Sequence, residues 1–184
     1  MNRLASPAQL RASVLRWALF VVPAVVLLGF LSGQYAGSSA DNPWFATLDK
    51  PGIYPPPVTF AIVWTVLYAL MGFALALVCA AWGARFRVLA ILAFVLQLLL
   101  NLAWSPVFFA EHEIRLALMI LGALNIAVLI TVVLFWQVRR VAGLLMVPYL
   151  AWILFATVLN WQFLVLNPRA DGAEVSNAVQ RIDL

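Results

Sequence analysis

The sequence predicts an all-α integral membrane protein, a bundle of five transmembrane helices. The first observation is composition: 66% of the 184 residues are hydrophobic and 10% are charged, with a mean hydropathy of +1.03. A soluble domain of this length cannot bury so much apolar surface. The second is five apolar runs, each near the roughly 20 residues that cross a bilayer as a helix. The third is that three of the four connections are short, which predicts antiparallel neighbours in one bundle.

The apolar runs divide the chain into three parts. The expected spans are residues 14–34, 58–82, 88–109, 114–138 and 144–166. The first run lacks a small-residue cleavage site, so it is expected to be a retained helix. A polar amino-terminal extension (1–13) therefore precedes a five-helix membrane domain (14–167). A polar carboxyl-terminal tail (168–184) follows and is expected to be mobile near Asp171, Gly172 and Glu174.

The distribution of basic residues predicts the orientation. Seven Lys or Arg fall on the amino-terminal side and four on the opposite side. The seven are Arg3, Arg11, Arg16, Arg85, Arg87, Arg139 and Arg140, and the four are Lys50, Arg115, Arg169 and Arg181. By the positive-inside rule, the amino terminus is expected in the cytoplasm if this is a bacterial inner membrane. The same short arginine clusters account for most of the net charge of +4, so nucleic-acid binding is not expected.

Several kinds of chemistry are disfavoured by what the spans lack. No span carries Lys, Arg, Asp or Glu near its middle, which argues against ion-coupled transport and ion channels. One cysteine, Cys79, and one histidine, His112, cannot form a disulfide framework or a His/Cys metal cluster. The run 111–113, Glu-His-Glu, is interpreted as a solvated turn. No catalytic residue and no metal ligand is assigned.

The stretch from Trp44 to Tyr68 is the most distinctive part of the chain. Three consecutive prolines at 55–57 favour a stiff, extended approach to a helix, and Pro57 suits its first position. Trp64 and Tyr68 lie four residues apart on one face of that helix. The pattern predicts either the lid and wall of an apolar pocket or aromatic anchors at the membrane interface.

Amides and indoles provide the polar groups inside the spans. Gln97, Asn101 and Trp104 share one face of the third span and are interpreted as pocket lining. Asn125 and Asn160 are interpreted as interhelical hydrogen-bonding residues.

The fifth span shows a second stripe of aromatic and small residues. Tyr149, Trp152, Ala156 and Asn160 lie at helical spacing. Ala156 either leaves room for a planar group or allows close helix packing. A cavity with such walls would suit a flat apolar ligand that bears carboxylates or amides.

In their order along the chain, these motifs resemble the TspO/MBR family, the family of the translocator protein or peripheral benzodiazepine receptor, and suggest a bacterial-type member. The matching motifs are Trp44-Phe45-x-x-Leu48-x-Lys50-Pro51 with Pro55-Pro56, Phe60-x-x-Val63-Trp64-Thr65-x-Leu67-Tyr68-x-x-Met71-Gly72, Gln97-x-x-x-Asn101-x-x-Trp104-x-x-x-Phe108-Phe109, and Pro148-Tyr149-Leu150-x-Trp152-x-x-Phe155-Ala156-x-x-Leu159-Asn160. The resemblance covers about residues 14–167.

The resemblance implies a membrane receptor or sensor, usually a homodimer, that binds porphyrins such as protoporphyrin IX or haem, and other tetrapyrroles, under its first loop. The porphyrin is a ligand, and no cofactor is required. Some members also bind cholesterol or synthetic isoquinoline and benzodiazepine ligands. The candidate ligand-binding residues are Phe45, Pro55, Trp64, Tyr68, Gln97, Asn101, Trp104, Phe108, Trp152 and Ala156.

Two alternatives to a receptor stay open: a porphyrin or lipid (sterol) transporter, and an enzyme that degrades porphyrin in light. Cholesterol binding is disfavoured, because Trp161 and Leu164-Val165 replace the Tyr and the Trp-Arg pair of the vertebrate motif. The small residues Ala90 and Ala93 predict a dimer edge on the third span.

Overall fold

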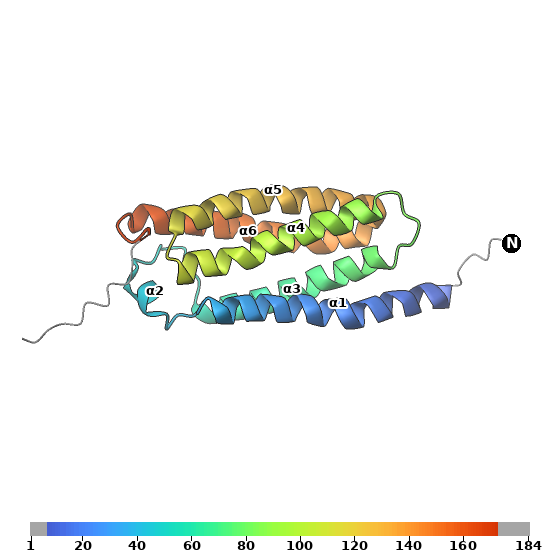
Figure 1. Ribbon diagram of the computed structural model, residues 1–184, viewed down its shortest axis with the longest axis horizontal. Helices are drawn as coiled ribbons and strands as arrows, with labels where there is room; N and C mark the ends of the chain where they lie inside the picture. Colours follow the sequence, from blue (N-terminus) through green and yellow to red (C-terminus); the bar gives the residue numbers. More distant parts are fainter. Residues whose placement is uncertain (1–6, 173–184) are drawn as a thin grey trace, which may run out of the picture.

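The computed structural model describes residues 7–172, and all its regular elements are helices. The elements are α1 (Pro7–Tyr35), α2 (Pro43–Thr47), α3 (Pro57–Cys79), α4 (Arg87–Ser105), the π-helix η1 (Pro106–Ala110), α5 (Ile114–Val138) and α6 (Arg140–Leu166). Five of them, α1, α3, α4 with η1, α5 and α6, are long and apolar enough to cross a membrane. The predicted five-helix bundle is confirmed, and the chain is a multi-pass membrane protein (Figure 1).

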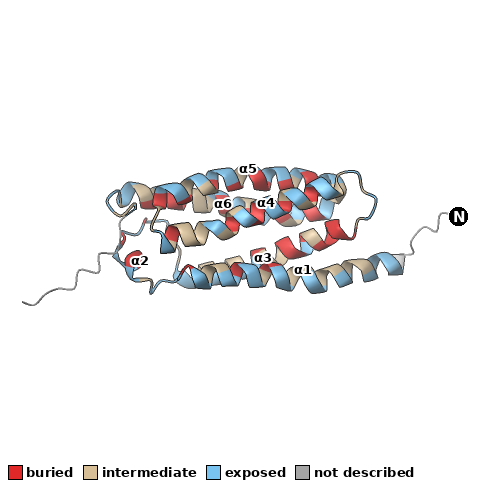
Figure 2. Ribbon diagram, in the orientation of Figure 1, coloured by how far each residue is buried: buried red, intermediate tan, exposed pale blue. Residues whose placement is uncertain are grey.

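The five long helices form one elongated bundle. α1 packs on α3, α3 on α6, α6 on α5 and α5 on α4, and α4 returns to touch α1. The short helix α2 lies at one end of the bundle, opposite the start of α1 (Figure 1). Buried residues face inward, whereas α1 is exposed along much of its length (Figure 2). The outward side chains are apolar, including Leu19 and Phe20, as expected for surfaces that face lipid.

Helix boundaries differ from the prediction at the end away from α2. Helix α1 begins at Pro7, about two turns before the expected start. Helix α3 ends at Cys79, three residues before the expected end at 82. The Arg87 guanidinium donates from Nε and Nη2 to the Cys79 carbonyl at 3.1 and 2.9 Å. These bonds satisfy a carbonyl left free at the helix terminus.

The turn between α5 and α6 is tighter than expected. Only Arg139 separates the helices, with an extended backbone at φ −150°, so α6 starts four residues before the predicted 144. A Cβ on Gly143 would lie 2.9 Å from Cα of Trp136. The absence of a side chain at Gly143 therefore lets the two helices meet this closely.

The end of the third span is a wide turn. Residues up to 109 were expected in one α-helix, but α4 ends at Ser105 and η1 follows. Pro106 has no N–H to donate, and the Glu111 amide reaches the Pro106 carbonyl at 3.0 Å, five residues back. This geometry defines a π-turn.

The predicted dimer edge is wrong at one of its two positions. Ala90 is fully buried in the core of its own bundle, so it cannot meet a second copy. Ala93 is half-buried and packs against the same core. The homodimer itself stays a prediction.

Candidate functional site

The loop before α3 folds inward over the end of the bundle. Asn42 starts α2: its Oδ1 accepts a hydrogen bond from the Phe45 amide at 3.0 Å, and Pro43 follows at the first helical position. The short helix then buries Trp44 and Phe45, and Leu48 is buried directly after it. For this loop the structure favours a lid over an exposed row of interface anchors. We call residues 36–56 the lid.

Beneath the lid lies a cluster of aromatic rings. The Phe45 ring centroid lies 5.2 Å from that of Phe109, 5.5 Å from Phe163, 5.9 Å from Tyr54 and 6.2 Å from Phe108. Such tilted and edge-on pairs stabilise by about 1 kcal/mol each beyond their burial. Phe45 thus ties the lid to η1 and α6.

Lys50 stabilises the lid through polar contacts within it. Its Nζ donates to the carbonyls of Phe45 and Leu48 and lies 4.0 Å above the Phe45 ring centroid. Desolvation lowers the pKa of this ammonium, and the neighbouring Asp49 carboxylate partly opposes that effect. The cation therefore binds two carbonyls near the end of α2 together with the Phe45 ring.

Deeper in the bundle, aromatic residues of α3 and α6 meet. The Trp64 ring stacks on Tyr68 at 5.3 Å and meets Trp152 edge-on at 6.5 Å. The Tyr68 hydroxyl donates to Oδ1 of Asn101 at 2.7 Å. The Tyr149 hydroxyl is buried beside Asn101 without the geometry of a hydrogen bond. Three helices, α3, α4 and α6, thus supply one layer, which we call the aromatic layer: Trp64, Tyr68, Asn101, Tyr149 and Trp152.

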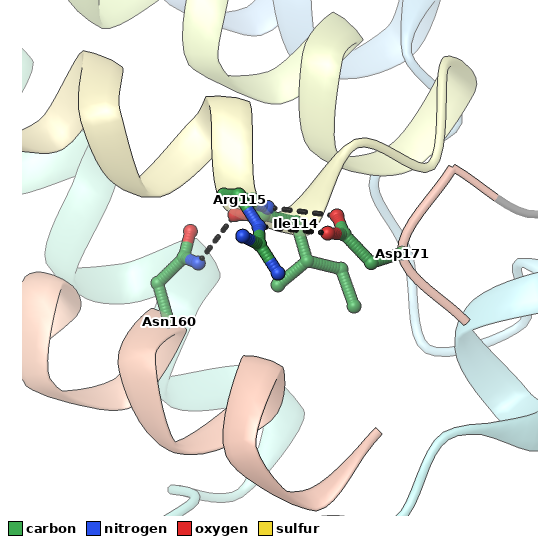
Figure 3. A network of polar contacts seen from close by, with 4 residues as sticks. All are labelled: Ile114, Arg115, Asn160 and Asp171. Atoms are coloured by element: carbon green, nitrogen blue, oxygen red, sulfur yellow. Dashed lines mark hydrogen bonds and ion pairs between the residues drawn. The ribbon is translucent and has the colours of Figure 1, made fainter. Parts of the chain in front are cut away.

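Trp104 joins the aromatic layer to the cluster under the lid. Its ring stacks on Phe108 at 5.2 Å, and its Nε1 donates to Oδ1 of Asn160 at 3.1 Å. Asn160 in turn donates from Nδ2 to the Ile114 carbonyl at 3.0 Å (Figure 3). The interhelical role predicted for Asn160 is confirmed.

Asn125 has the same kind of role. Its Nδ2 donates to the Leu121 carbonyl and to the Thr157 hydroxyl, both at 2.8 Å. Since Thr157 belongs to α6, this amide links α5 to α6 as predicted.

Gln97 and Trp152 differ from Asn160, whose amide is paired at both its oxygen and its nitrogen. Gln97 is fully buried, and within residues 7–172 neither atom of its amide has a hydrogen-bond partner. The Nε1 atom of Trp152 is equally buried and unpartnered in the same part of the chain. An amide buried without a partner costs on the order of 1–3 kcal/mol. The stability of the fold therefore does not explain why these polar groups are buried here.

The remaining candidates line the same region with less specific contacts. Pro55 is half-buried at the approach to α3, and Ala156 packs against the main core. Two open surface hollows, each about 350 Å³, lie elsewhere, one between lid and tail and one between α1 and α3. The candidate rings rest on one another, so a ligand would enter by separating them.

The segment after α6 holds the lid down, which the sequence did not predict. Oδ1 of Asn167 accepts from the Asp49 amide at 2.7 Å, and its Nδ2 donates to the Asp49 carbonyl at 3.0 Å. Asp171 accepts from the Arg115 amide at 2.9 Å and pairs with its guanidinium at 3.3 Å (Figure 3). A carboxylate is favourable there, at the amino terminus of α5.

The expectation of a mobile tail is therefore wrong for Asp171 and Gly172, because the Gly172 amide also donates to the His112 carbonyl at 3.0 Å. Glu174 lies outside the described residues. We call residues 167–172 the strap. Its only sequence signal is the return of Asn and Asp directly after an apolar span.

The turn between η1 and α5 is more ordered than a solvated turn. His112 has a positive φ of 60° and is half-buried, and its ring stacks on Trp44 at 4.5 Å. His112 thus contacts both lid and strap. Over residues 7–172 no three His, Cys, Asp or Glu side chains gather as metal ligands would.

Comparison with known proteins identifies the family that has this architecture. The TspO/MBR family matches residues 20–166. The chain is 40% identical over 142 residues to the tryptophan-rich protein TspO of Chlorobaculum tepidum, covering 77% of this chain and 89% of the relative. It is 34% identical over 156 residues to a tryptophan-rich sensory protein of Cereibacter sphaeroides, covering 82% and 92%. It is also 39% identical over 120 residues to the human translocator protein, covering 64% and 71%. With its five spans and its aromatic layer under a lid, this chain belongs to the TspO/MBR family.

Proposed function

We propose that this protein is a membrane receptor or sensor that binds tetrapyrroles, such as protoporphyrin IX or haem, between the lid and the aromatic layer. Trp64, Trp104 and Trp152 come from three helices, and all three pack against one core cluster. Flat indole and phenol faces are suited to stack on a flat macrocycle. The name of the Cereibacter sphaeroides relative, a tryptophan-rich sensory protein, supports a sensory role.

The observation that carries the proposal is the set of unpartnered polar atoms in this region. The Gln97 amide can donate and accept, and Trp152 Nε1 can only donate. A tetrapyrrole presents both a broad apolar face and carboxylate acceptors. A ligand that satisfied even one of these atoms would recover part of the cost of burying it.

The lid explains how a ligand could reach a packed interior. The lid is held by rings and by hydrogen bonds to the strap, not by a covalent link. Local opening of such segments costs less than global unfolding. Opening would expose the rings of Phe45 and Phe108, which then close over the bound macrocycle.

The test is a titration of the purified protein in detergent with protoporphyrin IX in darkness, followed by tryptophan fluorescence. Binding should quench the emission, because several indoles would contact the pigment. Trp152→Phe keeps a stacking ring but removes Nε1, so its affinity should fall severalfold. The proposed site would be contradicted if no saturable quenching occurred. It would also be contradicted if Trp152→Phe bound protoporphyrin IX with unchanged affinity. Illuminating the complex afterwards separates binding from light-dependent breakdown, since a pure receptor leaves the pigment spectrum unchanged.

A further inference from the structure

The two ends of the bundle carry opposite charges. Every carboxylate within residues 7–172 lies at the lid end: Asp41, Asp49, Glu111, Glu113 and Asp171. The ionic groups that this part of the chain places at the other end are all arginines: Arg11, Arg16, Arg85, Arg87, Arg139 and Arg140. No described carboxylate is therefore close enough to neutralise the arginines of that end.

One of the two hollows lies at this basic end, on the outside of the bundle. It measures about 350 Å³ and runs between α1 and α3. Its lining consists of Leu10, Arg11, Val14, Leu15, Ala18, Phe73, Leu77 and Arg139. The α1 members at 11, 14, 15 and 18 follow helical spacing along one face. Leu15 is 60% exposed and Phe73 is 40% exposed, so the apolar floor is open to the bilayer.

We propose that this groove binds an anionic phospholipid. The acyl chain would lie on the apolar floor, and the phosphate would sit between Arg11 and Arg139. A guanidinium matches phosphate oxygens with two parallel N–H donors. Basic pockets between helices are suited to anionic headgroups. The floor calls for a chain attached to the phosphate, so a lipid fits better than a free phosphate. The site lies at the opposite end of the bundle from the aromatic layer and is independent of tetrapyrrole binding.

The test measures lipid binding to the purified full-length protein in a neutral detergent by native mass spectrometry. Phosphatidylglycerol and phosphatidylcholine with identical acyl chains serve as probes, and glycerol phosphate serves as the chain-free anion. Phosphatidylglycerol should bind preferentially. Arg11→Gln and Arg139→Gln should each weaken it about fivefold, the effect expected for one arginine at a membrane surface. Arg16→Gln and Arg140→Gln remove the same charge from neighbouring positions outside the groove and should change it by less than about twofold.

A second variant tests the floor without changing the charge. Ala18→Trp fills the groove and should weaken phosphatidylglycerol binding while the melting temperature stays near that of the parent. Equal binding of the two lipids would overturn the proposal. So would equal losses in the Arg11 and Arg16 variants, which would indicate diffuse attraction. Glycerol phosphate competing as well as the lipid would indicate a free-anion site and would likewise overturn it.

Discussion

Asn167 clamps the backbone of Asp49 with both atoms of its amide, at 2.7 Å to the amide nitrogen and 3.0 Å to the carbonyl oxygen. The two residues are 118 positions apart, one after the last span and the other in the lid. One side chain thus satisfies both the N–H and the C=O of a residue far away in the sequence, as a paired backbone segment would. The clamp therefore couples lid opening to the position of the strap.

Asn167→Ala should free the lid without unfolding the bundle. Of its three side-chain hydrogen bonds, the two to Asp49 hold the lid. Each is worth about 1 kcal/mol, so amide exchange at Asp49 and its neighbours should quicken at least fivefold. Hydrogen–deuterium exchange with peptide-level readout measures this directly. Arg169→Ala is the control, since its exposed side chain makes no hydrogen bond within residues 7–172. Equal exchange in both variants would show that the clamp does not limit opening.

Gly29→Ala should disturb the aromatic layer from outside it. A Cβ at Gly29 would lie 2.2 Å from the Tyr68 ring, so the ring must move and its bond to Asn101 must lengthen. We expect a lower melting temperature and severalfold weaker protoporphyrin binding. Gly122→Ala, in a helix where the new Cβ meets nothing within 4 Å, should stabilise slightly. The same loss at both positions would point to a general intolerance of the helices.

Gln97→Leu should have opposite effects on stability and binding. Removing an unpartnered buried amide while nearly keeping the volume should stabilise the ligand-free protein by about 1 kcal/mol or more. Protoporphyrin affinity should fall severalfold, because the polar contact is gone. Thermal unfolding with and without ligand measures both quantities. Asn125→Leu, which breaks bonds to Leu121 and Thr157, should instead lower the melting temperature. A destabilised Gln97→Leu protein would mean that the amide serves the fold.

Trp64→Ala should weaken protoporphyrin binding about fivefold, the equivalent of roughly 1 kcal/mol for one stacked ring. Trp82→Ala is the matched control. This indole is 70% exposed at the far end of the bundle, under the Arg87 guanidinium. Fluorescence titration of both variants gives the comparison. Comparable losses would mean that the tryptophans act as interface anchors rather than as walls of one site.

The charge asymmetry predicts how the chain crosses its membrane. Seven Lys or Arg on the amino-terminal side against four on the other should keep the amino terminus in the cytoplasm. A reporter fused after Leu184 should then be active outside, and one fused before Met1 should be active in the cytoplasm. Reporters reading the same compartment at both ends would be incompatible with five crossings.

Local chemistry made the helices predictable. The bounds 114–138 of α5 were predicted to the residue, and the proline run correctly placed Pro57 at the start of α3. The preceding Pro56 is extended, at φ −52° and ψ 141°, as three consecutive prolines require. Backbone geometry and hydropathy are properties of short windows, so one sequence suffices for them.

Long-range pairing was the part that the sequence could not supply. Nothing near Asn167 indicates Asp49 as its partner, and nothing near Gly29 indicates the ring of Tyr68. For Gln97, the spacing correctly predicted a place on the Asn101 face. Its lack of a partner could appear only when neighbouring helices were in position, because hydrogen-bond satisfaction is a property of the assembled bundle.

In the wide turn of η1, the number of residues should matter more to the packing than the identity of the exposed ones. Each residue of an α-helix advances the side chains by about 100°, and a π-turn holds roughly one residue more than an α-turn. Deleting Pro106 or Val107 would therefore swing Phe108 away from Trp104, whereas exchanging the exposed Ala110 would leave it in place. Natural insertions and deletions in relatives of this chain should avoid this segment and collect instead in exposed parts of the lid, such as residues 39–41.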